Sequence, residues 1–133
     1  MTSVGKLRVH LLEAHITHDT ETFGKMDPYV KMTCRDDEWK SSTAEDMGTK
    51  PKWTGQHFDI NVHYVGDDLH YKVWDDDTGK DDFIGEGSTK LSALIHEHGI
   101  DEWFDIQFKG KPAGKLHFKC VWEPVDGHHH HAH

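Results

Sequence analysis

Five aspartates fall within the eight-residue segment from Asp75 to Asp82, which reads Asp-Asp-Asp-Thr-Gly-Lys-Asp-Asp. Crowded carboxylates repel one another and raise one another's pKa, so a folded chain carries such a loop when solvent or a hard cation offsets the charge. An acidic run by itself is typical of a solvated turn. A second acidic segment, which ends at Asp27, changes that interpretation if the fold brings the two segments together.

Eight short segments show the alternation of apolar and polar residues that is typical of half-buried strands. A short helix is predicted over 91–98, closed by Gly99, and a turn over 110–114. Together they predict an all-β fold, an eight-stranded antiparallel β-sandwich with Greek-key connections and one short helix. The predicted strands cover residues 6–14, 28–35, 38–43, 53–62, 69–74, 83–90, 103–108 and 116–122.

The chain of 133 residues has the length of a single domain. Residues 1–126 are predicted to form that domain, whereas 127–133 read Gly-His-His-His-His-Ala-His and resemble a purification tag. Cys34 and Cys120 lie in alternating segments without metal-type spacing, so we expect reduced, structural thiols, with a disulfide between them as the alternative. Four tryptophans on predicted strands are expected in the core: Trp53, Trp74, Trp103 and Trp122.

The two acidic segments are expected to lie at one end of the sandwich. Successive strands run in opposite directions, so the connections that follow the first, third and fifth strands meet: those around Asp27, around Lys50 and over 75–82. Calcium takes about six to eight oxygen ligands in a flexible geometry, whereas zinc and copper favour histidine or cysteine. The sequence therefore predicts an all-oxygen calcium site that includes Asp27, Asp75, Asp77 and Asp82.

Charge and hydropathy narrow the class of partner. The formal net charge of −9 argues against sequence-independent nucleic-acid binding through a basic surface. No run approaches the roughly 18 apolar residues of a membrane helix, and residues 1–6 have no hydrophobic signal-peptide region, so we expect a cytoplasmic protein. Several lysines alternate with acidic residues and are interpreted as solvated surface: Lys31, Lys40, Lys50 and Lys52.

Four motifs occur in the order in which the C2 domain family has them, and the chain resembles that family over residues 5 to 124. They are Gly5-Lys6-Leu7-Arg8-Val9, Gly24-Lys25-Met26-Asp27-Pro28-Tyr29-Val30, Lys50-Pro51-Lys52-Trp53, and Val73-Trp74-Asp75-Asp76-Asp77 with Asp82-Phe83-Ile84-Gly85. The family is a calcium-dependent, phospholipid-binding β-sandwich. The first strand leads straight into the calcium loop, and the chain closes on Gly114-Lys115-Leu116-His117-Phe118, which resembles the type II topology. That topology implies that both termini lie away from the calcium loops.

The resemblance also implies a set of site residues. Side-chain ligands are implied at Asp27, Asp75, Asp77 and Asp82, with the backbone carbonyl of Asp76. The first-loop ligand is either Glu21, which occupies the family's usual position, or Asp19, which we favour because a shorter carboxylate is the family's habit. The predicted lipid contacts are Phe23, Lys25 and Lys80, and the Phe23 ring either inserts below the headgroups or folds back onto the sandwich.

These expectations predict calcium-dependent binding of anionic phospholipid, which recruits the protein or an attached domain peripherally to a membrane. The two acidic segments together have a formal charge of −6, so without metal an anionic bilayer should repel them. This charge is the sum over eight acidic residues and two lysines: Asp19, Glu21, Asp27, Asp75, Asp76, Asp77, Asp81 and Asp82, with Lys25 and Lys80. An alternative from another class is a calcium-regulated protein-interaction module that binds no lipid. A hydrolase is disfavoured because no nucleophile is paired with a base in the sequence.

Overall fold

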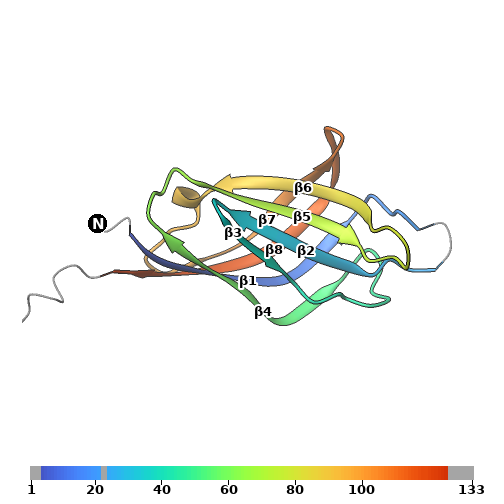
Figure 1. Cartoon of the computed structure of the whole chain (residues 1–133), viewed down its shortest axis with the longest axis horizontal. Helices are drawn as coiled ribbons and strands as arrows, with labels where there is room; N and C mark the ends of the chain where they lie inside the picture. The colour runs from blue at the N-terminus through green and yellow to red at the C-terminus, as the bar shows by residue number, and fades with distance from the viewer. Residues whose placement is uncertain (1–3, 22–23, 126–133) are drawn as a thin grey trace, which may run out of the picture.

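The computed structural model describes residues 4–21 and 24–125, and within them it confirms the all-β prediction. Eight antiparallel strands and one 3-10 turn are present (Figure 1). Each predicted strand lies within or close to an observed one. The elements are β1 (Gly5–Ile16), β2 (Pro28–Cys34), β3 (Asp37–Lys40), β4 (Lys52–Val62), β5 (Asp68–Asp75), β6 (Asp82–Lys90), η1 (Leu91–Ala93), β7 (Ile100–Phe108) and β8 (Lys111–Pro124).

The eight strands form one continuous sheet in the order β3-β2-β5-β6-β7-β8-β1-β4. It folds over into a sandwich of two four-stranded halves, β3-β2-β5-β6 and β7-β8-β1-β4, called the first and second sheets here. A single residue pair, Glu86 with Gln107, joins them along the β6–β7 edge. The core lies between the sheets, where alternate residues of the strands turn inward. Fully buried examples come from both sheets: Leu7, Val9, Leu69, Val73, Leu116 and Phe118.

The two cysteines are buried free thiols, as the first of the two sequence interpretations expected. Burial raises the pKa of Cys120 to about 12, so its thiolate form is absent at neutral pH and the thiol is unreactive. The tryptophan prediction is partly wrong. Trp53 and Trp122 are buried, but Trp103 is 38% exposed and stacks on His117 on the outer face of its sheet.

Two connections differ from the sequence expectations. The predicted helix over 91–98 shrinks to the three-residue turn η1, because so short a segment gains too little from helix formation and is anchored by burial of Leu91, Leu94 and Ile95. The predicted turn over 110–114 is tighter, at Lys109 and Gly110, both of which have positive φ. Gly114 lies inside β8 with φ 133°, where a Cβ atom would collide with the backbone of His15 on β1.

All strands run lengthwise, so the connections gather at two ends (Figure 1). Segments 17–21, 24–27, 41–51 and 76–81 lie at one end, called the loop end here, together with the turn at Lys109. The first and last described residues lie at the other end, where the N–H of Val125 donates to the carbonyl of Val4 at 2.9 Å. Among the described residues, no helix has the length and apolar character needed to cross a bilayer.

Candidate metal centre

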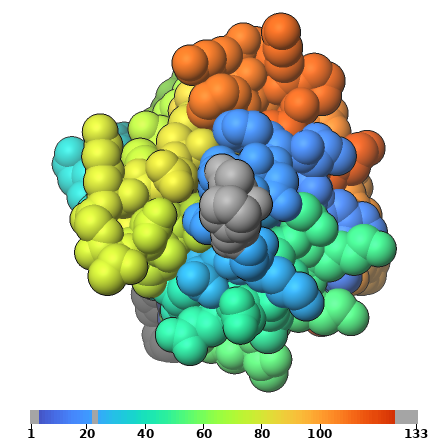
Figure 2. Space-filling view, turned by 90° about the vertical axis from the view of Figure 1, so that its right-hand side faces the viewer, coloured from blue at the N-terminus to red at the C-terminus, as the bar shows by residue number. Residues whose placement is uncertain are grey.

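The loop end presents the two acidic segments side by side. Figure 2 looks onto this end, where the first loop (blue) lies between the acidic loop 76–81 (yellow-green) and the loop 41–51 (green). The antiparallel topology therefore brings together three connections that are far apart in sequence, as predicted.

Asp75 fastens the first loop to the end of β5. Its side chain is completely buried, at 0% exposure. One carboxylate oxygen accepts a hydrogen bond from the backbone N–H of Asp27 and the other accepts one from the hydroxyl of Thr20, each at 2.8 Å. Within the described part of the chain, no basic side chain forms an ion pair with this carboxylate. Because an unpaired buried charge is costly, a cation beside Asp75 would offset a real penalty.

Three further carboxylates converge in front of Asp75. Glu21, Asp77 and Asp82 each offer an oxygen, and these atoms all lie within 4.8 Å of one another. A hydrogen bond with Asp75 and the charge of that neighbour, assisted by burial and by Asp77 and Asp82, raise the pKa of Glu21 to about 7. A cation held between these carboxylates would offset the repulsion of their negative charges. Their oxygen-only donor set suits a hard ion such as calcium.

The remaining predicted ligands tie the loops to one another. The N–H of Asp76 donates to the carbonyl of Asp27 at 2.9 Å, and the Asp76 carboxylate accepts from the Thr43 hydroxyl at 3.1 Å. One oxygen of the Asp27 carboxylate accepts from the N–H of Asp46 at 2.6 Å. Hydrogen bonds among three loops thus hold these residues in place before any ion binds.

Asp19 and Glu21, the two candidates for the first-loop ligand, have different surroundings. The Asp19 carboxylate is exposed and accepts a hydrogen bond from the N–H of Glu21 at 3.0 Å. It therefore shapes the loop backbone, whereas the longer Glu21 side chain joins Asp77 and Asp82. The geometry favours Glu21 as the ligand, contrary to our preference from sequence, which considered side-chain length and not the path of the loop.

Sequence reasoning missed the role of Asp81, which counted only toward the charge of the loop end. Its carboxylate accepts from the Tyr29 hydroxyl and, at 3.0 Å, from the N–H of Asp77. The Tyr29 hydrogen bond, with the Asp77 N–H, lowers the pKa of Asp81. Asp81 therefore ties the acidic loop to β2. The sequence signal for this contact was Tyr29, because it is the last residue of the Asp-Pro-Tyr motif that begins at Asp27.

The predicted lipid contacts are only partly described. Lys25 and Lys80 are exposed at the loop end, and Phe23 lies outside the described residues. In their place the structure shows Met47, which is 46% exposed in the loop 41–51. A lone methionine in a polar loop gives no sequence signal.

A row of lysines crosses the first sheet. Lys31 of β2 is paired directly with Lys40 of β3 on one side and with Lys72 of β5 on the other. Like charges directly opposite one another destabilise a sheet, and Glu86 of β6, the other register partner of Lys72, offsets part of this repulsion. Strand register brings Lys72 to the other two, which no linear pattern of the sequence indicates.

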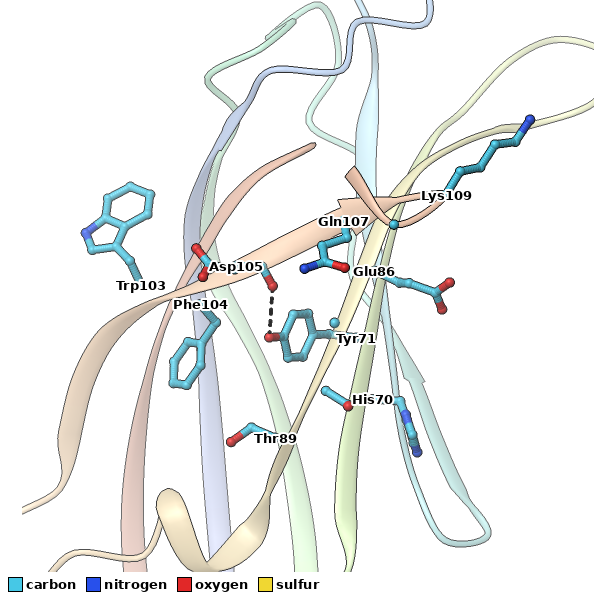
Figure 3. A pocket seen from close by; sticks show the side chains of 12 residues that line it. His70, Tyr71, Glu86, Thr89, Trp103, Phe104, Asp105, Gln107 and Lys109 are labelled. Carbon is cyan, nitrogen blue, oxygen red and sulfur yellow. Dashed lines mark hydrogen bonds between the residues drawn. The ribbon is translucent and has the colours of Figure 1, made fainter. Parts of the chain in front are cut away.

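A large cleft lies elsewhere, where β6 and β7 part beyond the Glu86–Gln107 pair (Figure 3). Its volume is about 690 Å³. Trp103, Phe104 and Asp105 line one side, and the Tyr71 hydroxyl reaches across to donate to the Asp105 carbonyl at 3.2 Å. This cleft is open and mostly polar, and it shares no residue with the carboxylate cluster.

A family model described as "C2 domain" matches residues 5–106. The chain belongs to the C2 domain family. The resemblance seen in the sequence is thereby confirmed, and the eight-stranded sandwich is the fold of this C2 domain.

Similar proteins include a whole small protein and parts of larger ones. This C2 domain is 36% identical to 16 kDa phloem protein 2 of Arabidopsis thaliana over 121 residues, which cover 86% of this chain and 82% of the relative. It is 33% identical to extended synaptotagmin-3 of Xenopus tropicalis over 125 residues, which cover 89% of this chain and only 14% of the relative.

Solved structures agree with this assignment. A calcium-bound structure of two C2 domains, A and B, of extended synaptotagmin 2 matches 93% of this C2 domain and 47% of that chain, with a TM-score of 0.78 and 29% identity. A C2 domain-containing protein from a putative elicitor-responsive gene matches 94% of this chain and 93% of its own, with a TM-score of 0.78 and 31% identity.

Proposed function

We propose that this C2 domain binds Ca²⁺ at the loop end and, with the ion in place, anionic phospholipid. The observation that carries the proposal is the convergence of Glu21, Asp77 and Asp82 within 4.8 Å beside the buried Asp75. In a structure of extended synaptotagmin 2 that is calcium bound, the matching domains have the same fold.

The carboxylate spacing fits the ion. Calcium–oxygen distances are about 2.3–2.6 Å, so two oxygens on opposite sides of one ion lie about 5 Å apart. The observed limit of 4.8 Å is compatible with this span. The proposed side-chain ligands are Glu21, Asp27, Asp75, Asp77 and Asp82, with the carbonyl of Asp76, while Asp19 supports the loop.

Charge explains why lipid binding should depend on the ion. The two acidic segments of the loop end carry a formal charge of −6 and are repelled by an anionic bilayer. Bound calcium supplies positive charge and open coordination positions for phosphate or carboxylate oxygens of the lipid. Because two such ions leave the loop end at about −2, direct bridging contributes more than charge reversal. Calcium and lipid therefore strengthen each other's binding by the same factor.

Two neighbouring features add membrane contacts. Met47 is partly exposed at the same end, and full burial of a side chain of that size contributes roughly 1.5–3 kcal/mol. The row of Lys31, Lys40 and Lys72 adjoins the acidic loop through β5 and offers cations to lipid phosphates. Replacing Lys31 and Lys72 with glutamine should weaken binding to anionic vesicles by about 1 kcal/mol per lysine and reduce its salt dependence.

Co-sedimentation with vesicles tests the proposal. Protein lacking residues 127–133 is mixed with phosphatidylserine or phosphatidylcholine vesicles, in calcium or in chelator. We expect pelleting only with phosphatidylserine and calcium, and loss of pelleting in the Asp77→Asn/Asp82→Asn variant. The control is Asp36→Asn, which removes one negative charge instead of two, at the β2–β3 turn of the opposite end, and should cause no loss.

Calcium titration calorimetry separates the two parts of the proposal. Calcium binding without any pelleting would overturn the lipid step and favour the alternative of a calcium-regulated protein-interaction module. Pelleting that survives in Asp77→Asn/Asp82→Asn would overturn the metal step.

A further inference from the structure

Two histidines face each other on the outer surface of the second sheet, in the body of the sandwich. His10 of β1 and His57 of β4 are direct partners in the antiparallel register. Their ring centroids lie 5.8 Å apart, with the ring planes tilted by 52°. His10 is half-buried and His57 is exposed, whereas the adjacent Val9 and Phe58 point into the core.

The spacing of the two rings matches that of two imidazoles on one metal ion. Zinc binds imidazole nitrogen at about 2.0–2.1 Å, which places the ion about 3.2 Å from each ring centroid. At a tetrahedral angle the two centroids are then about 5.2 Å apart. The observed 5.8 Å differs by about half an ångström, which small rotations of the side chains remove.

Both rings are available as ligands. Within the described residues, neither His10 nor His57 makes a side-chain hydrogen bond, whereas His117 has both ring nitrogens engaged by Glu13 and Asp101. His57 belongs to β4, the outermost strand of its sheet, so water reaches the remaining coordination positions.

The charges around the pair leave room for a cation. Arg8 and Asp59 form a bidentate ion pair, with hydrogen bonds of 2.7 and 3.0 Å, so these two charges offset each other. Lys119 of β8 is the other register partner of His10, and Asp101 of β7 lies directly opposite Lys119 on its other side. Burial, and then His57, Lys119 and Arg8, lower the pKa of His10, which keeps its imidazole in the neutral form that binds metal.

We propose that His10 and His57 form a two-histidine site for a divalent transition metal ion of the zinc and copper class. Imidazole ligands favour these ions over calcium and magnesium, so the site is chemically distinct from the carboxylate cluster. Two protein ligands leave the remaining positions to water. Copper binds more tightly than zinc at such a site, following the general order of affinities of divalent ions.

Titration with Zn²⁺ or Cu²⁺ alone tests the site. The protein must lack residues 127–133, because the tag histidines bind the same ions. Calorimetry is run with millimolar calcium present, which occupies the carboxylate cluster without competing for imidazole. For Cu²⁺, electron paramagnetic resonance shows whether nitrogen ligands are present. We expect one ion per chain with two nitrogen ligands.

The variants decide the assignment. His57→Gln, at an exposed position that folding tolerates, should lower the affinity at least tenfold, and His10→Gln should do the same. The matched control is His70→Gln, which removes an exposed histidine from β5 in the other sheet and should leave the affinity unchanged. Unchanged affinity in His57→Gln, or an equal loss in His70→Gln, would overturn the proposal.

Discussion

The two ends of the sandwich cap the same core in opposite ways. At the loop end, three long connections are held by hydrogen bonds to carboxylates, with Asp75 buried and Glu21 pressed against it. At the other end, the N–H groups of Leu91 and Ser92 donate to the carbonyls of Asp67 and Val65, both at 2.9 Å, and buried leucines fill the space beneath.

The far end contributes favourable contacts to the folded state, whereas the loop end contains repulsion between carboxylates. The far end pairs several of its charges, as in the ion pairs of Lys90 with Asp68 at 3.1 Å and of Arg35 with Asp67 at 3.3 Å. The loop end leaves carboxylates crowded together, a cost that a bound cation would offset and that protonation of Glu21, whose pKa is raised to about 7, also reduces. Changes at the far end should therefore affect folding alone, and changes at the loop end should affect the response to calcium.

The largest effect is expected at the far end. Leu94 is fully buried behind η1, and Leu94→Ala should lower the free energy of unfolding by about 2–5 kcal/mol through lost burial and an unfilled cavity. Urea unfolding measures this loss. Calcium affinity should stay unchanged, and the exposed Ser92→Ala should change stability by less than about 0.5 kcal/mol. A weaker calcium affinity in Leu94→Ala would mean that the two ends are coupled.

The next effect concerns Asp75. Calcium at 100 times its dissociation constant should stabilise the domain by about 2.7 kcal/mol, because it binds only the folded form. Asp75→Asn removes a buried charge that the ion offsets, so this stabilisation should disappear. Thermal unfolding with calcium and with chelator measures it, and Asp36→Asn is the control. Full calcium stabilisation of Asp75→Asn would rule out a metal centre built around this residue.

A smaller effect is expected for the exposed side chain of Met47. Met47→Ser should weaken binding to phosphatidylserine vesicles by at most about 1.5–3 kcal/mol while calcium affinity without lipid stays the same. Val125→Ser removes an equally exposed apolar side chain at the far end and should have no effect. Equal losses in the two variants would show that Met47 has no special contact with the bilayer.

The smallest effect is a pH dependence of stability that arises away from both ends. Burial lowers the pKa of His117, but hydrogen bonds and charges of Asp101 and Glu13 outweigh it and raise the pKa overall. The stabilisation is therefore complete below about pH 6.5, the pKa of an unfolded histidine, and is lost as pH rises through the folded pKa. Unfolding of wild type and His117→Gln across a range from about pH 5.5 to about pH 8.5 should show the difference shrinking with pH. A constant difference would contradict this assignment.

Periodicity alone predicts most of this fold, since buried residues alternate in β1, β5 and β8 as they do in the sequence. It fails where one residue decides the geometry. The segment 110–114 has the composition of a turn, but Gly114 lies inside β8, because only glycine fits against His15 there. Trp103 is apolar yet exposed, since it packs against histidines on the outer face.

The acidic loop was evident from sequence, but the partners of each carboxylate were not. Choosing between Asp19 and Glu21 requires the path of the first loop, and the alignment of Lys72 with Lys31 requires the register of β2 and β5. Both depend on contacts between residues far apart in the chain, which short-range patterns do not contain. The hydroxyls of Thr20 and Thr43 that hold the carboxylates likewise carry no signal in the sequence.

The hydrogen bond between Val125 and Val4 also bears on circular permutation of such a sandwich. Because the ends of the described chain meet, linking them and opening a surface turn instead would keep every strand next to the same neighbours. The turn at Lys109 and Gly110 is one such place. The order of the strands along the polypeptide would thus change while the carboxylate cluster stays assembled from the same loops.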